Sequence, residues 1–268
     1  MQTWWKQHTW AVQETAGWQL ANLNLYISRL EREWQFRMQR PDFISEDRYD
    51  WQFLGTVDEA PQQHIDLIRY VCFKTEPSLV LRPVLADRPM VTRPAHSILI
   101  APQVSVTLYI STPVWIQVVG QSSTLPLLDI PVNRPTDSWF GGSTREGDLC
   151  YATRIFGRLQ LSELEQRPFR AITPVRIYNA GDTPFPLKRL SVPVQMLPLH
   201  VSESGRLWTP TLDVTCTPAT DKAEIRLFHR VEPSAGPTTL LSPARIPLGT
   251  GSLVKALDLL FASRSPGA

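Results

Sequence analysis

The chain has 268 residues, of which 43% are hydrophobic and 19% are charged, so a chain that is disordered throughout is excluded. Its formal net charge is only +2, with acids interspersed among the bases, and this argues against a nucleic-acid-binding protein. The 24 prolines interrupt nearly every apolar run and disfavour long helices, because an interior proline costs a helix about 3 kcal/mol.

Alternation of apolar and polar residues predicts strands from the N-terminal region onward. Residues 18–27 and 33–38 both alternate with period two around a short connection, which predicts a β-hairpin. Residues 103–111 and 113–119 are the clearest pair of strands, since β-branched and aromatic residues are enriched in both. Further strands in this half are expected at 65–73 and 79–85.

The second half continues in the same style. Residues 149–154 are expected to form a strand, and 161–166 one or two helical turns that stop at Pro168. Turn residues between apolar segments then predict two hairpins and one more strand, at 171–192, 196–216 and 222–231.

Many short strands with proline and glycine turns predict an all-β fold of the antiparallel β-sandwich type. The length leaves both one large β domain and two lobes open, and we expect two lobes, an N-terminal one over 11–130 and a C-terminal one over 131–231. Long parallel βαβ units are absent from the pattern, which excludes Rossmann and TIM-barrel enzymes.

The C-terminal region has a different composition. Residues 232–250 are rich in proline and glycine and are expected to be a linker. A short amphipathic helix is expected at 251–263, with Ser252 as its N-cap. Its apolar stripe predicts a partner-binding surface, on its own oligomer or on another protein, formed by Leu253, Leu257, Leu260 and Phe261.

The turn-rich segment 137–154 combines aromatic residues, glycines, acids and a cysteine, and we expect it to lie at a structural junction. Trp139 and Phe140 are interpreted as a plug that anchors the turn, beside glycines that tolerate unusual backbone angles. The alternative is a ligand site in the same segment. The candidate residues for either role are Asp137, Trp139, Phe140, Arg145, Asp148, Cys150 and Tyr151.

No catalytic or metal-binding signature accompanies this segment. A nucleophile elbow needs glycines two residues before and after the nucleophile, whereas Gly147 lies three before Cys150 and Ala152 two after it. The three cysteines form no Cys-x-x-Cys pair, and the five histidines are widely separated. We therefore expect Cys150 to be a core cysteine, and neither a metal nor a cofactor is predicted.

The N-terminus and the lengths of the apolar runs indicate the cellular compartment. The N-terminus lacks the apolar segment of a signal peptide, and no window approaches the roughly 20 apolar residues of a membrane span. A cytoplasmic protein with reduced thiols and no membrane span is expected.

The run from VTLYISTPVWI through DSWFGGSTREGDLCYATR to FRAITPVRIYNAGDTPFPLKRLSVPV and GRLWTPTLDV resembles a prokaryotic domain-of-unknown-function family, number four-three-two. The resemblance covers about residues 10–230 and implies an uncharacterised, mostly β protein with no assigned catalytic residues. Some relatives are associated by gene neighbourhood with small mechanosensitive channels, which implies a membrane-channel partner.

These observations together predict a non-enzymatic cytoplasmic binding or adaptor protein that acts on a membrane channel or another cell-envelope partner, or that self-associates. The alternative is an enzyme or small-ligand-binding protein with its site between the two lobes. Carbohydrate binding by the N-terminal tryptophans is a weaker alternative, because Trp18 and Trp34 have the core-facing phase of their strands.

Overall fold

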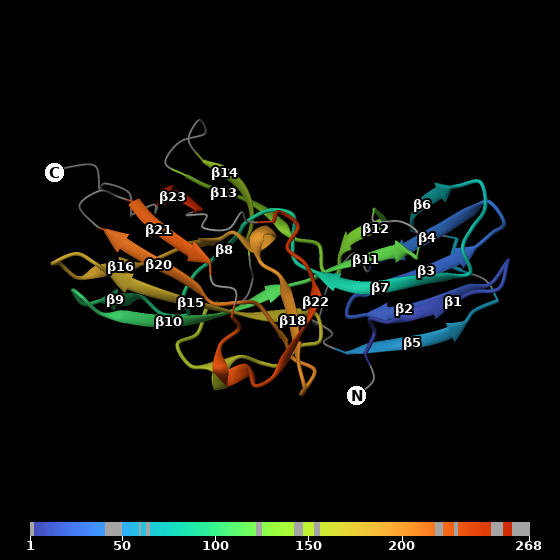
Figure 1. Cartoon of the computed structure of the whole chain (residues 1–268). Helices are drawn as coiled ribbons and strands as arrows, with labels where there is room; N and C mark the ends of the chain where they lie inside the picture. Colours follow the sequence, from blue (N-terminus) through green and yellow to red (C-terminus); the bar gives the residue numbers. More distant parts are fainter. Residues whose placement is uncertain are drawn as a thin grey trace. The chain divides into compact units, whose positions relative to one another are not determined.

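The computed structural model describes residues 3–40, 50–58, 60–62, 65–121, 125–141, 147–152, 156–217, 222–227, 230–247 and 254–258. They form an all-β fold of several sheets, which confirms the predicted class (Figure 1). No helix among these residues is long and apolar enough to cross a membrane.

The chain divides into two compact units. The first comprises Met1–Val84, Pro113–Arg134 and Arg167–Phe169; the second comprises Leu85–Thr112, Pro135–Gln166 and Arg170–Ala268. Each unit is assembled from separate stretches of chain, whereas the lobes expected from the sequence were continuous ranges.

The first unit contains a five-stranded antiparallel sheet in the order β5-β2-β3-β4-β6. Its strands are β2 (Thr15–Leu20), β3 (Leu23–Arg29), β4 (Glu33–Gln39), β5 (Trp51–Thr56) and β6 (Asp66–Val71). β3 and β4 form the predicted hairpin. One face of the sheet is buried because every second residue is apolar, as in Trp18, Leu25, Ile27, Trp34 and Phe36.

The tryptophans of the N-terminal region belong mainly to this core. Trp4, Trp10, Trp18 and Trp34 are at most 2% exposed. His8 lies against this cluster, with its ring centroid 4.9 Å from that of Trp18. These four indoles are therefore not available to stack on a sugar.

A second antiparallel sheet of the first unit has the order β1-β7-β11-β12, formed by β1 (Gln7–Thr9), β7 (Ser78–Val84), β11 (Trp115–Gly120) and β12 (Pro126–Pro131). The preceding strand, β10 (Ser105–Pro113), instead pairs with β15 in the second unit. Only Val114 separates β10 from β11, and a single residue is too short to reverse the chain into a hairpin.

The second unit is built on an eight-stranded sheet in the order β22-β18-β19-β15-β20-β21-β23, with β10 also paired to β15. Beside β10, its strands are β15 (Arg170–Asn179), β18 (Leu199–Ser202), β19 (Leu207–Trp208), β20 (Leu212–Thr217), β21 (Lys222–Leu227), β22 (Thr238–Ser242) and β23 (Val254–Asp258). The sheet is mixed, because β15 runs parallel to both β19 and β20.

Two small sheets complete this unit. One has the order β13-β14-β8-β17, from β13 (Thr136–Phe140), β14 (Asp148–Ala152), β8 (Met90–Thr92) and β17 (Leu190–Val192). The other pairs β9 (Ile98–Ile100) with β16 (Phe185–Leu187). The helical turns expected at 161–166 correspond to a 3-10 turn, η1 (Leu161–Glu163).

The two predicted hairpins of the second half have different outcomes. β18 and β19 pair across a turn in which Gly205 adopts φ +80°, so a hairpin forms within 196–216. The hairpin predicted over 171–192 is wrong: β15 pairs with β19 and β20, β16 with β9, and β17 with β8. Each of these segments finds its partner far away in the sequence.

The C-terminal expectations are corrected as well. Within the segment expected to be a linker, β22 pairs with β18, and Arg245 Nε donates to the carbonyl oxygen of Leu85 at 2.6 Å. The helix expected at 251–263 is not formed at Val254–Asp258, which is β23 paired with β21. A helix of about ten residues is marginal alone, so an available strand edge overrides the helical pattern.

Leu257, one residue of the expected helical stripe, thus lies in a strand opposite Ala223. The other three residues of the stripe, Leu253, Leu260 and Phe261, lie outside the described residues.

Candidate functional site

The segment singled out in the sequence forms an antiparallel hairpin of β13 and β14 in the second unit. Opposite residues of an antiparallel pair share a face, so Asp137 and Trp139 lie on the same face as Tyr151 and Leu149. Phe140 and Cys150 point to the other face. The structure thus gathers the predicted site residues within one unit, except Arg145, which lies outside the described residues.

The inner face of this hairpin is apolar. Phe140 and Cys150 form a buried cluster with Val91 of β8. Cys150 Sγ donates to the carbonyl oxygen of Asp148 at 3.4 Å and lies 3.9 Å from Ser191 Oγ. Burial raises the pKa of the Cys150 thiol, so it stays protonated near neutral pH. This environment suits a core cysteine and not a nucleophile.

The outer face carries charges that are already paired. The Arg88 guanidinium lies 3.5 Å from Asp137 Oδ1, 3.8 Å from Asp87 Oδ2 and 5.3 Å from the Tyr151 ring centroid. Tyr151 donates its hydroxyl to Asp87 Oδ1 at 3.0 Å. Burial, with the hydrogen bond to Asp87, raises the pKa of Tyr151. The phenol therefore acts as a hydrogen-bond donor to Asp87.

Trp139 and Phe140 divide the role that the sequence assigned to both. Phe140 is the buried anchor at 4% exposure, with the Arg189 guanidinium 5.3 Å from its ring centroid. Trp139 is 39% exposed and lies over Gly147, where a Cβ would come within 2.4 Å of the indole Nε1. Glycine at 147 is thus required by the close approach of an aromatic ring.

A second surface, which the sequence interpretation did not assign, lies on β6 at the edge of the five-stranded sheet (Figure 1). All six of its residues are exposed. Val71 is 73% exposed and Phe73, just beyond the strand, is 91% exposed. We call the exposed apolar residues of this region the β6 edge: Leu67, Ile68, Tyr70, Val71 and Phe73.

The sequence does carry a signal for this surface. In residues 65–73 apolar side chains occur on both phases of the strand, so neither face is polar. That pattern is typical of a strand covered on both faces. It predicted a strand correctly, but it did not reveal that the cover is missing among the described residues.

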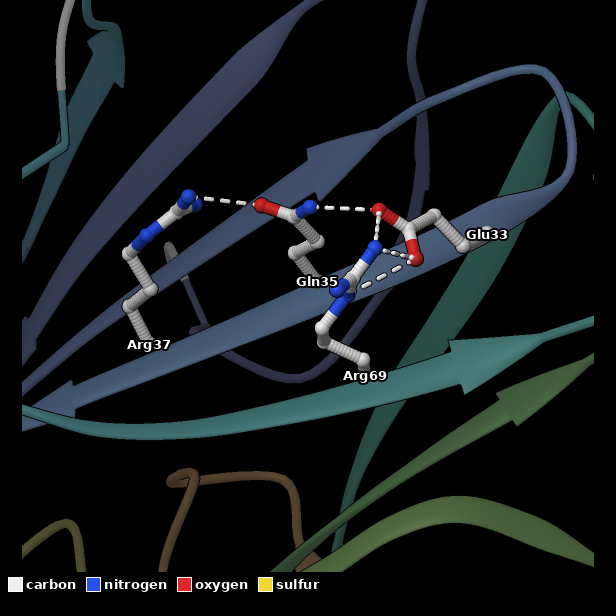
Figure 2. A network of polar contacts seen from close by, with 4 residues as sticks. All are labelled: Glu33, Gln35, Arg37 and Arg69. Atoms are coloured by element: carbon white, nitrogen blue, oxygen red, sulfur yellow. Dashed lines mark hydrogen bonds and ion pairs between the residues drawn. The ribbon is translucent and has the colours of Figure 1, made fainter.

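A polar network on one face of the sheet anchors β6 to β4 (Figure 2). Arg69 donates from Nε and Nη2 to the Glu33 carboxylate at 2.9 and 3.0 Å. Gln35 Nε2 donates to Glu33 Oε1 at 2.5 Å, and Arg37 Nη2 donates to Gln35 Oε1 at 2.6 Å. The Gln35 hydrogen bond, with Arg69, lowers the pKa of Glu33. The ionised carboxylate thus holds β6 against β4, and Asp66 at the start of β6 forms a separate ion pair with Arg134 at 3.3 Å.

The backbone of β6 has donors and acceptors on its open side. The amide of Cys72 donates to the carbonyl oxygen of Arg32 at 2.8 Å, towards β4. Amide direction alternates along a strand, and the β4–β6 register has no shift. The N–H and C=O groups of Leu67, Arg69 and Val71 therefore face away from β4, where no described strand pairs with them.

Metal-binding clusters and the histidine His8 were considered as further candidates beside the β13–β14 hairpin and the β6 edge. No group of three or more His, Cys, Asp or Glu side chains suited to a metal occurs in the described part of the chain. The pKa of His8 is lowered to about 4, mainly by burial and then by Lys6, so its imidazole is neutral near pH 7.

Fold and surfaces together define an all-β protein of antiparallel and mixed sheets with an open apolar strand edge. The chain belongs to the family described as "Protein of unknown function (DUF432)", whose model matches residues 4–260. This confirms the family resemblance and extends it to the C-terminal region. Neither a curated protein nor a solved structure matches the chain.

Proposed function

We propose that this is a non-enzymatic, cytoplasmic binding or adaptor protein that holds an extended segment of a partner protein along the β6 edge. The observation that carries the proposal is the row of outward backbone groups at Leu67, Arg69 and Val71, flanked by exposed apolar side chains. Strand addition uses such a row for affinity and the flanking side chains for specificity.

The edge lacks several of the features by which proteins block strand pairing, although it carries two charged residues, Asp66 and Arg69. β6 is six residues long and regular, and it contains neither a proline nor a lysine. In the same unit β1 has only three residues, and β12 begins and ends with proline. An edge that is less protected than its neighbours supports a binding role for β6.

The β13–β14 hairpin supports the non-enzymatic half of the proposal. Its Cys150 is buried and protonated, and Arg88, which lies beside the hairpin, is paired with Asp87 and Asp137. The partner class suggested by the family resemblance is a membrane channel or another cell-envelope protein.

Capture from lysate on two variants at one position tests the proposal. In Leu67→Pro the outward N–H is lost and strand addition is blocked, while the ladder to β4 is kept. Leu67→Thr is the matched control, since it loses similar apolar area but keeps the N–H. A partner retained by the native chain and Leu67→Thr, but lost by Leu67→Pro, is expected.

Hydrogen exchange on the recovered complex locates the contact. The amides of Leu67, Arg69 and Val71 should become protected on binding. A partner retained equally by both variants, with these amides unprotected, contradicts the proposal. A large thermal shift with a metabolite and no edge-dependent partner favours the alternative of a small-ligand protein.

A further inference from the structure

The free β6 edge presents a physical problem when no partner is bound. Open backbone groups next to exposed apolar residues pair readily with other strands and lead to aggregation. The edge therefore needs a cover in the unbound protein, and one copy of the chain offers another copy an edge of the same shape.

Symmetry makes this cover self-limiting. Two β6 strands related by a twofold axis perpendicular to the sheet run antiparallel, so each copy uses its own β6 strand and the assembly closes as a dimer. Under this axis each residue keeps its face, and opposite residues must share a face. Only registers in which the two residue numbers sum to an even number are therefore allowed.

Strand overlap and charge together select among these registers, since only those centred on Ile68 or Arg69 pair five residues of β6. With Arg69 opposite its own copy, two guanidinium groups face each other, which is unfavourable. With Ile68 opposite its own copy, Leu67 faces Arg69 of the second copy and Asp66 faces Tyr70 of the second copy. This register pairs residues 66–70, all inside β6, and places no like charges opposite each other.

The backbone fits the same register. Leu67 and Arg69 carry outward N–H and C=O groups, so they form the hydrogen-bonded pairs between the copies. Ile68 then occupies a non-hydrogen-bonded pair, where side chains approach most closely. Each Arg69 keeps its ion pair with Glu33 at 2.7 Å, which neutralises it locally.

We propose that in the absence of a partner the β6 edges of two copies pair antiparallel about Ile68, and that this dimer is the resting form of the binding site. The inference rests on the proposed function, because the partner segment and the second copy use the same edge and exclude each other. Binding is then an exchange of one strand for another.

Site-specific cross-linking tests the register. In a Cys72→Ser background, Ile68→Cys places two thiols in a pair whose Cα atoms lie about 4.5 Å apart, within the range of a disulfide. Tyr70→Cys is the matched control, since four residues of offset separate its copies by about 13 Å. Mild oxidation should give at least a tenfold higher yield of linked dimer for Ile68→Cys.

Sedimentation velocity of the full chain tests the dimer itself. A concentration-dependent dimer is expected for the native chain and for Leu67→Thr, and a monomer for Leu67→Pro. A synthetic peptide of residues 65–73, with serine at position 72, should convert the native dimer into a peptide-bound monomer. A native chain that stays monomeric, or linkage at Tyr70→Cys in place of Ile68→Cys, overturns the inference.

The two proposals fail in different ways. A monomeric native chain whose lysate partner is still lost on Leu67→Pro leaves the adaptor function standing and removes the dimer. A dimer with the expected cross-link, from which no lysate protein displaces a copy, supports pairing of the copies and removes the adaptor function.

Discussion

β5 and β6 close the two ends of one sheet in opposite ways. On β5 the register shifts between Gly17 and Trp18, so Leu54 is an extra, bulged residue, and Gly55 next to it adopts φ +81°. The Phe53 ring packs 5.1 Å from that of Trp18. Both strands have largely exposed side chains, but β6 has no bulge.

The difference shows how an edge is protected or left open. A bulge disrupts the row of backbone groups that another strand needs, and aromatic packing ties the edge to the core. β6 is held by its ladder to β4, by the Arg69–Glu33 ion pair and by an ion pair of Asp66 with Arg134 at 3.3 Å. One edge is thus blocked, and the other is left open among the described residues, as the proposed binding role requires.

The largest expected effect comes from removing the packing that secures the β5 side. Trp18 is fully buried against His8 and Phe53, so Trp18→Ala should lower the free energy of unfolding by about 3–5 kcal/mol. Phe73→Ala, beyond β6, should stay within about 0.5 kcal/mol. Denaturant unfolding measures both; similar losses would break the comparison.

The second-largest effect should come from acid, which weakens the packing of His8 at the β5 edge. The pKa of His8 lies near 4 in the folded protein against an ordinary 6.5, so the unfolded chain binds the proton first. The stabilisation is present above pH 6.5 and is lost as the pH falls towards 4, by up to about 3 kcal/mol. In His8→Leu the melting temperature should depend less on pH over this window. A smaller dependence should remain from His200, because burial lowers its pKa as well. An unchanged slope contradicts the assignment.

Proline substitutions at two neighbouring positions of β6 test which backbone amides face β4 and which face outward. The Ile68 amide faces β4, so Ile68→Pro should cost about 2 kcal/mol through a lost ladder hydrogen bond. Leu67→Pro, whose amide faces outward, should cost clearly less. Equal melting temperatures for the two variants would show that the amide directions are wrong.

The smallest effect concerns β13, an edge strand of the second unit whose Trp139 lies over Gly147. Gly147→Ala brings a Cβ against the Trp139 indole and should cost about 1–2 kcal/mol. The double change Gly147→Ala with Trp139→Ala should recover part of that loss in thermal unfolding. No recovery would mean that the cost comes from the Phe140 carbonyl oxygen, 2.8 Å from the added Cβ, and not from the indole.

Much of the secondary structure could be predicted from the sequence, and much of the pairing could not. Period-two alternation correctly marked the β3–β4 hairpin, because a short connection leaves one partner within reach. The same reasoning failed for 171–192, where three segments pair with β8, β9, β19 and β20 from elsewhere in the chain. Alternation defines which face of a strand is apolar, but it carries no information about distant partners.

The candidate site shows the same division. The sequence identified the hairpin 137–154 as unusual, and the structure gathers Asp137, Trp139, Cys150 and Tyr151 there. Which aromatic is buried was decided by the pairing, which places Phe140 on the core face and Trp139 on the outer one. No local pattern distinguishes two adjacent aromatics whose strand has no assigned partner.

By itself, the sequence determined that this chain is a β protein, because proline frequency and period-two alternation act on each residue locally. Tertiary structure alone decided that 254–258 is a strand, that β10 and β11 separate into different units, and that β6 has no described neighbour on one side. The physical reason is that a strand satisfies its backbone groups through another segment. Whether a segment forms a strand, and with which partner, therefore depends on which strand edges the rest of the chain leaves open.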